Sequence, residues 1–85
     1  MRSEQDLRAL AREHLQAKTL PRHDPEYAGE GPGIGLPCRL CREPITVDQV
    51  EYELHVTSAG AAPWVERIRL HRRCFAAWEM ERTRS

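Results

Sequence analysis

The chain has no net charge, because its 13 basic residues are matched by 13 acidic ones. A strongly basic protein attracts nucleic acid through its overall electric field, so any such attraction here must be local. The chain also has no apolar run long enough to cross a bilayer, and its first six residues are mostly charged or polar. These absences predict a cytoplasmic protein that has no membrane partner.

Cysteine is scarce, with three residues in a chain of 85. An odd number of cysteines does not fit a disulfide-bonded secreted scaffold and indicates a reducing compartment. A chain of this length forms one small domain, whose hydrophobic core alone contributes little surplus stability. We therefore expect a bound metal ion to stabilise the fold.

The sequence also lacks the residue combinations that catalysis requires. It contains no Ser/His/Asp pattern and no paired carboxylates. We therefore expect neither an enzyme nor a protein that acts on a small-molecule substrate.

The sequence does contain two pairs of metal-binding residues. Cys38 and Cys41 form the first pair, His71 and Cys74 the second, and two residues separate the members of each pair. This spacing lets both side chains of a pair reach one ion from a tight turn or a single helical turn. The 29 residues between the pairs suffice for a hairpin that brings the two pairs together.

These four residues predict one structural zinc ion, held by three cysteines and one histidine. A lone Cys-x-x-Cys pair also fits a redox dithiol, but the second pair and the use of all three cysteines favour zinc. Four protein ligands close the coordination shell, whereas a catalytic zinc ion keeps one position for water or substrate. No cysteine is then left over to act as a nucleophile.

Residues 1–19 predict an amphipathic helix at the start of the chain. Ser3 suits the N-cap position, and Pro21 should stop the helix. Its narrow apolar stripe consists of leucines at helical spacing, namely Leu7, Leu10 and Leu15. The stripe either docks on the rest of the chain or stays free for a partner, and we favour docking.

Residues 20–35 are rich in glycine and proline and predict a linker without regular structure, flexible from Gly29 to Gly33. Residues 36–85 form the predicted zinc-binding domain, whose folded unit should run from Leu36 to Arg82. A shortened chain that starts near Ile34 should then fold once zinc is bound.

The predicted zinc-binding domain contains a hairpin and a helix. Apolar residues alternate with Glu51, Glu53 and His55, which predicts a strand with one buried face (Val50, Tyr52, Leu54, Val56). Residues 58–63 suit a turn, and 64–70 suit the returning strand. Residues 72–82 lack glycine and proline and predict a closing helix that carries Cys74. The fold class is therefore a small α+β domain of the treble-clef type: knuckle, hairpin and C-terminal helix.

The stretch Cys38-Arg39-Leu40-Cys41-Arg42-Glu43-Pro44-Ile45, followed by His71-x-x-Cys74-Phe75, resembles the zinc finger of the poly(ADP-ribose) polymerases. The likeness extends from Cys38 to about Trp78. Because the fingers of that family bind DNA breaks, the resemblance implies recognition of DNA. The chain departs from the family pattern at Arg69-Leu70, where a tryptophan and a second aromatic residue are usual, and at Glu51, where a basic residue is usual.

The whole chain also resembles short uncharacterised bacterial zinc-finger proteins. The likeness rests on the Gly-Pro-Gly approach to the knuckle and on the helical stretch Cys-Phe-Ala-Ala-Trp-Glu. This second resemblance implies no activity.

Two functions fit this sequence. The first is a DNA-binding finger with a regulatory role, whose contacts would come from basic residues near the site, namely Arg67, Arg69, Arg72 and Arg73. Those arginines can instead compensate the single negative charge of a zinc ion bound to three thiolates. The alternative function is a protein-interaction module without nucleic-acid binding. Its candidate contacts are the leucine stripe and the aromatic residues Tyr27, Trp64 and Trp78, the last expected in the core.

Overall fold

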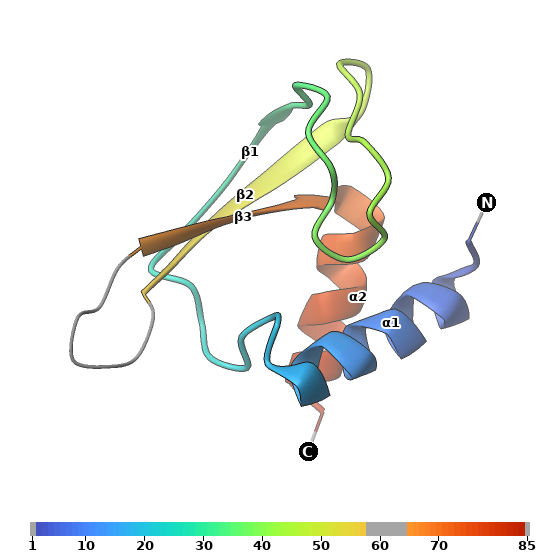
Figure 1. Cartoon of the computed structure of the whole chain (residues 1–85), viewed down its shortest axis with the longest axis vertical. Coiled ribbons are helices and arrows are strands. Elements are labelled where there is room, and N and C mark those ends of the chain that lie inside the picture. Colours follow the sequence, from blue (N-terminus) through green and yellow to red (C-terminus); the bar gives the residue numbers. More distant parts are fainter. Residues whose placement is uncertain (1, 58–64, 85) are drawn as a thin grey trace.

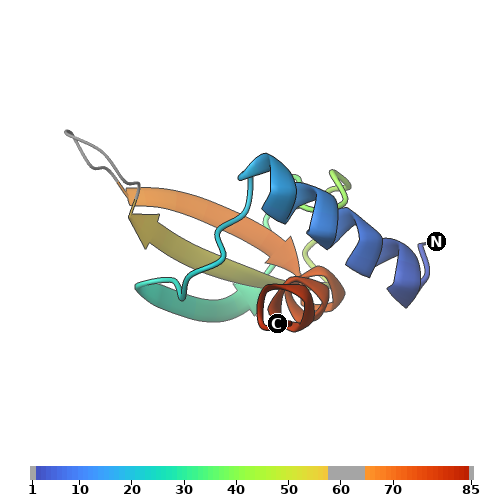
Figure 2. The ribbon, with the colours of Figure 1, turned by 90° about the horizontal axis from the view of Figure 1, so that it is seen from below.

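The computed structural model describes residues 2–57 and 65–84 of the chain. The elements follow in the order α1 (Glu4–Ala17), β1 (Tyr27–Pro32), β2 (Val50–Thr57), β3 (Val65–His71) and α2 (Arg72–Arg82). The three strands form one antiparallel sheet in the order β1-β2-β3, and α2 follows β3 directly (Figure 1). Figure 2 shows the strands as one curved layer, with the two helices side by side next to it. The predicted α+β class is confirmed.

Helix α1 has clear physical signals at both ends. The Ser3 hydroxyl accepts a hydrogen bond from the Asp6 backbone N–H at 3.1 Å, and the Asp6 carboxylate accepts one from the Ser3 N–H at 3.4 Å. This reciprocal capping satisfies two N–H groups that a helix start otherwise leaves unpaired. Lys18 ends the helix in the left-handed conformation, with φ of 62°. The predicted helix is confirmed.

The apolar stripe of α1 docks on the rest of the protein. Its innermost side chains, Leu7, Ala11 and Leu15, are each at most 4% exposed and join the same buried cluster as Trp78 of α2. Burying each leucine contributes about 1.5–3 kcal/mol to stability. The alternative that leaves this stripe free for a partner is therefore wrong.

An ion-pair cluster joins α1 to the C-terminal end of α2. The Glu81 side chain is only 2% exposed, and its carboxylate lies 2.7 Å from Arg8 Nε and 3.3 Å from an Arg12 guanidinium nitrogen. Burial, the largest single influence, raises the pKa of Glu81, but hydrogen bonds from Arg8 and Arg12 outweigh it and leave this pKa below its ordinary value. Glu81 is therefore ionised in the folded protein at neutral pH.

The glycine- and proline-rich segment contains an edge strand, so the prediction that residues 20–35 lack regular structure is wrong. Strand β1 pairs with β2 from Tyr27 opposite His55 to Pro32 opposite Val50. An edge strand forms hydrogen bonds with a neighbouring strand on one side only. A proline, which has no N–H group to donate, and glycines are therefore tolerated at the edge of a sheet. The pairing removes the basis for expecting flexibility from Gly29 to Gly33.

Gly29 has a local role in β1. The Tyr27 ring lies across this position and against His55, with 4.7 Å between the two ring centres. A side chain at position 29 would collide with the Tyr27 hydroxyl. Glycine therefore leaves room for the Tyr27 ring, and a larger residue at this position would require the ring to move.

The buried face of the sheet consists of Leu54 and Val56 from β2 and Ile68 and Leu70 from β3. The predicted alternation holds for these side chains, whereas Val50 is 37% exposed. Glu51, expected at the solvent face, is only 7% exposed. It lies opposite His71, at the end of the sheet where the loop before β2 hydrogen-bonds to that histidine. The predicted turn and Trp64 lie outside the described residues.

Helix α2 closes the core, as predicted. Trp78 is fully buried, and its indole Nε1 donates a hydrogen bond to the Pro21 carbonyl at 2.9 Å. Phe75 stacks on Tyr52 of β2, with 4.3 Å between ring centres. The single buried cluster also includes Leu20, so side chains from all three regions distinguished in the sequence meet in one core. Within the described ranges, no helix is long and apolar enough to cross a bilayer.

Because α1 belongs to the core, Leu15→Ala should destabilise the zinc-loaded protein by about 2–5 kcal/mol, the usual cost of emptying a buried leucine site. Gln16→Ala, at the next and exposed position, should cost less than about 0.5 kcal/mol. Urea unfolding at one fixed zinc concentration measures both variants. Equal unfolding midpoints for the two variants would show that α1 contributes no core packing.

Candidate metal centre

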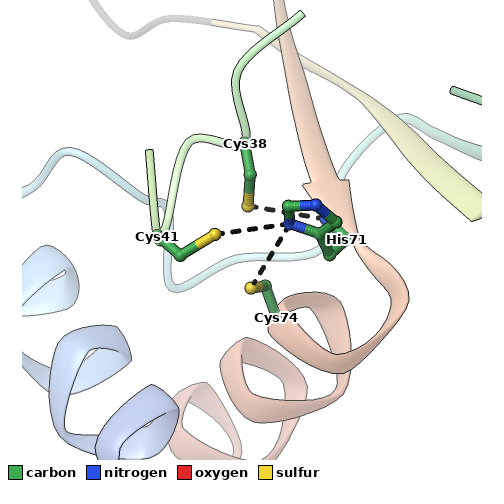
Figure 3. A group of neighbouring side chains, drawn as sticks. All are labelled: Cys38, Cys41, His71 and Cys74. Carbon is green, nitrogen blue, oxygen red and sulfur yellow. Dashed lines mark hydrogen bonds between the residues drawn. The ribbon is translucent and has the colours of Figure 1, made fainter. Parts of the chain in front are cut away.

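Four predicted ligands converge from three parts of the fold (Figure 3). Cys38 and Cys41 come from the loop between β1 and β2, His71 ends β3, and Cys74 lies in the first turn of α2. Their ligand atoms all lie within 4.8 Å of one another. The predicted Cys3His group is therefore assembled in the folded protein.

Backbone hydrogen bonds shape the loop that carries the first ligand pair. The Cys38 N–H donates to the Glu43 carbonyl at 2.9 Å, and the Arg42 N–H donates to the Cys38 carbonyl at 2.9 Å. Arg42 adopts a positive φ of 71°, which closes the turn directly after Cys41. The Arg39 N–H donates to the Arg69 carbonyl at 2.8 Å and fastens the loop to the outer edge of β3. Local turns and one sheet contact thus fix the cysteine pair.

The orientation of His71 determines which ring nitrogen faces the thiols. Its Nδ1 lies 3.3 Å from Cys41 Sγ and 4.0 Å from Cys74 Sγ. Its Nε2 lies 3.2 Å from two acceptors, the Pro44 carbonyl and the Gln49 side-chain oxygen. Two acceptors at Nε2 require a proton there, so Nδ1 keeps the lone pair that a metal ligand needs.

Gln49 itself is held in place. Its side-chain oxygen also accepts a hydrogen bond from the Thr46 backbone N–H at 2.9 Å. The Gln49 N–H donates to the Thr46 carbonyl at the same distance. Gln49 therefore belongs to a small turn whose geometry sets the ring orientation of His71.

The three thiols have divergent acidities because they lie close together out of water. A hydrogen bond with Cys74 lowers the pKa of Cys38, and burial works against this effect. The same hydrogen bond and burial raise the pKa of Cys74, while burial mainly raises that of Cys41. Without a nearby cation only one thiolate forms readily, whereas a dication would stabilise all three.

The donor set suits a soft or borderline metal ion. Three thiols and one imidazole are the ligand types that select zinc-like ions, whereas calcium and magnesium prefer carboxylate and carbonyl oxygens. Each cysteine is at most 6% exposed, so water has little access to the sulfur atoms. The group can therefore hold one metal ion.

The four arginines predicted to contact nucleic acid occupy two elements. Arg67 and Arg69 lie on β3, where Arg69 is 3.5 Å from a Glu51 oxygen and 3.8 Å from a Glu53 oxygen. Arg72 and Arg73 lie in the first turn of α2 and line a hollow of about 450 Å³ beside the metal ligands. Arg72 and Arg73 therefore lie beside the four metal ligands, whereas Arg69 has acidic neighbours on the sheet.

Sequence reasoning missed several supporting residues. One is Gln49, whose side-chain oxygen contacts His71. Another is His14, whose Nε2 lies 3.2 Å from the Leu40 carbonyl and so connects α1 to the cysteine loop. Arg2 lines the hollow beside the metal ligands and accepts, through its carbonyl, a hydrogen bond from Arg73. These contacts join residues far apart in sequence, so no motif or periodicity in the chain signals them.

Comparison of the chain with family models, with curated proteins and with solved structures gives no match. The structure supports the predicted cluster of Cys38, Cys41, His71 and Cys74. The resemblance to the poly(ADP-ribose) polymerase finger and the assignment to the treble-clef type stay predictions.

Proposed function

We propose that the protein is a small non-enzymatic module that is stabilised by one structural zinc ion and binds nucleic acid. The convergence of four soft ligand groups within 4.8 Å carries the zinc part of this proposal. Four protein ligands leave no position for water or substrate, which favours a structural over a hydrolytic ion. The ion would tie the cysteine loop, β3 and α2 together.

Zinc binding should drive folding. We expect one zinc ion per chain, because the four ligands form one site. The free energy of structural zinc binding, on the order of 10–16 kcal/mol, is comparable to the stability of a small domain, so the chain should fold only when zinc is bound. Elemental analysis measures the stoichiometry, and amide spectra recorded during chelation follow the fold. A metal-free chain that keeps dispersed amide signals in β2, β3 and α2 would contradict this prediction.

Gln49 should contribute to metal affinity without touching the metal. Gln49→Ala removes one acceptor from His71 Nε2, and we expect zinc affinity to fall about tenfold, since the Pro44 carbonyl remains as an acceptor. Asp48→Asn is the matched control, because Asp48 accepts a hydrogen bond from Thr46 in the same turn but has no recorded contact with His71. Competition with a chromophoric chelator measures both affinities. Equal zinc affinities for the two variants would show that Gln49 does not contribute to metal binding.

The nucleic-acid part of the proposal is supported by the charge beside the metal ligands. Arg2, Arg72 and Arg73 line one hollow, and among residues 2–57 and 65–84 no ion pair engages Arg72 or Arg73. Glu43 at the same hollow and a zinc ion with three thiolates would each supply one negative charge. Three arginines against two negative charges leave a positive surplus that suits phosphate groups.

The phosphate contacts should therefore come mainly from Arg72 and Arg73. We expect Arg72→Gln/Arg73→Gln to weaken DNA binding and to reduce the slope of log affinity against log salt by about 0.9 for each lost contact. Arg67→Gln is the control for the loss of one positive charge outside the hollow. Fluorescence anisotropy over a salt series, with duplex, nicked and single-stranded DNA, measures these changes while zinc content is monitored.

Two other results would redirect the proposal. An equal loss of affinity in Arg67→Gln would place the contacts on β3 as well. Absence of binding to every DNA form at low salt, with zinc bound, would exclude nucleic acid and leave a protein partner.

One observation favours a protein partner as the second candidate function. Ile34 and Val47 are 64% and 78% exposed, on the first and last parts of the loop between β1 and β2. The Gly35 N–H donates to the Ile45 carbonyl at 2.8 Å and the Gly33 N–H to the Gln49 carbonyl at 3.0 Å, so these two parts of the loop are held together. Exposed apolar side chains that gather on one surface mark interaction sites. A partner would contact this part of the β1–β2 loop, because Leu7, Leu15 and Trp78 are buried.

A further inference from the structure

A second hollow lies at the opposite end of α2 from the metal group. Its volume is about 510 Å³, and it is bounded by α1, by the segment that follows α1, and by the end of α2. Most of its lining side chains are polar, and three of them are arginines: Arg12, Arg22 and Arg84, with Gln16, Leu15 and Glu81. Nothing in the zinc site or its surroundings requires this arrangement.

The arginines around this hollow outnumber the acidic groups. The buried Glu81 carboxylate lies within 4 Å of three guanidinium groups, those of Arg8, Arg12 and Arg84. One carboxylate contributes one negative charge, and the C-terminal end of a helix contributes about half a charge more. Three arginines therefore exceed the local negative charge by about one and a half units, before Arg22 is counted.

The surplus remains when the nearest neighbours are included. Arg82 forms ion pairs with Asp24 and Glu79 and donates a hydrogen bond to the Arg22 carbonyl at 3.4 Å. Counting these residues gives five arginines against three carboxylates and the half charge of the helix end, a surplus of about one and a half positive charges. That surplus is comparable to the charge of about −1.5 to −2 that a phosphate group carries at neutral pH.

Anchoring α1 to α2 does not require so many arginines. Arg8 alone reaches Glu81 at 2.7 Å and is the most buried of the three partners, at 29% side-chain exposure. The side chains of Arg12 and Arg84 are 50% and 61% exposed, so much of each guanidinium group faces solvent. Each guanidinium has five N–H donors, and a single carboxylate cannot accept hydrogen bonds from all of them.

We propose that Arg12, Arg22 and Arg84 form a binding site for a phosphate group. The planar guanidinium fork matches the oxygen spacing of phosphate and forms paired, charge-assisted hydrogen bonds with it. Glu81 holds Arg12 and Arg84 at the rim, and the Gln16 amide adds a neutral donor. The phosphate belongs either to a small phosphate ester or to a nucleic-acid backbone, and the second source rests on the nucleic-acid function proposed above.

The test uses the full zinc-loaded chain, titrated with inorganic phosphate at low ionic strength. The Nε–Hε resonances of Arg12, Arg22 and Arg84 should shift and saturate, while sodium chloride at equal ionic strength should leave them in place. Arg22→Gln/Arg84→Gln should weaken phosphate binding about tenfold or more, since each charge-assisted contact contributes strongly. Arg67→Gln, the control on β3, should bind phosphate like the unaltered protein.

These substitutions spare the buried pair of Arg8 and Glu81, so the fold should persist. Arg22→Gln alone is a second, milder variant, because Arg22 forms no recorded ion pair in the described part of the chain. It should still weaken phosphate binding about threefold. Shifts that do not saturate, or unchanged affinity in both variants, would overturn the proposal.

A DNA titration separates the two phosphate sources. If DNA shifts the same resonances and Arg22→Gln/Arg84→Gln weakens its binding, the site contacts the nucleic-acid backbone. If inorganic phosphate binds but no DNA form does, the site takes a small phosphate ester and only the nucleic-acid function fails. If DNA binds and Arg22→Gln/Arg84→Gln changes neither ligand, the phosphate site fails and the nucleic-acid function stands.

Discussion

Three buried thiols and one imidazole meet where the cysteine loop, β3 and α2 come together. The hydrogen bond between Cys38 and Cys74 lowers the pKa of Cys38 and raises that of Cys74, while burial raises that of Cys41, so only one thiolate forms readily in the absence of a cation. A bound dication would reverse that balance and fix three segments at one point. Because His71 Nε2 is already held by Pro44 and Gln49, the imidazole requires no reorientation to serve as a ligand.

Helix α2 is fixed at both of its ends by different physical means. Cys74 places its first turn at the cluster of four metal ligands, and Glu81 connects its last turn to α1 through Arg8 and Arg12. Between them Trp78 fills the core and hydrogen-bonds to Pro21, directly before the segment that leads to β1. The N-terminal helix is thus part of the packing that holds α2 in position for the ligands.

Local rules in the sequence predicted the ligand set, both helices and the two strands of the hairpin, β2 and β3. Ligand spacing and hydrophobic periodicity depend on near neighbours, so they can be read without knowledge of the fold. Strand β1 could not be found this way, because its two glycines and one proline indicate a loop and only its pairing with β2 makes it a strand. The contact of Gln49 with His71 and the burial of Glu51 likewise depend on distant partners.

The zero net charge of the chain conceals an uneven distribution of charge. On the sheet, cross-strand neighbours such as Glu53 and Arg69 largely offset each other. At both ends of α2, arginines outnumber acidic groups. The helix that lies between the two basic hollows has 11 residues and is about 16 Å long, which exceeds the Debye length of about 10 Å at 0.1 M salt. The two hollows should therefore bind anions almost independently at physiological salt and reinforce each other only when salt is low.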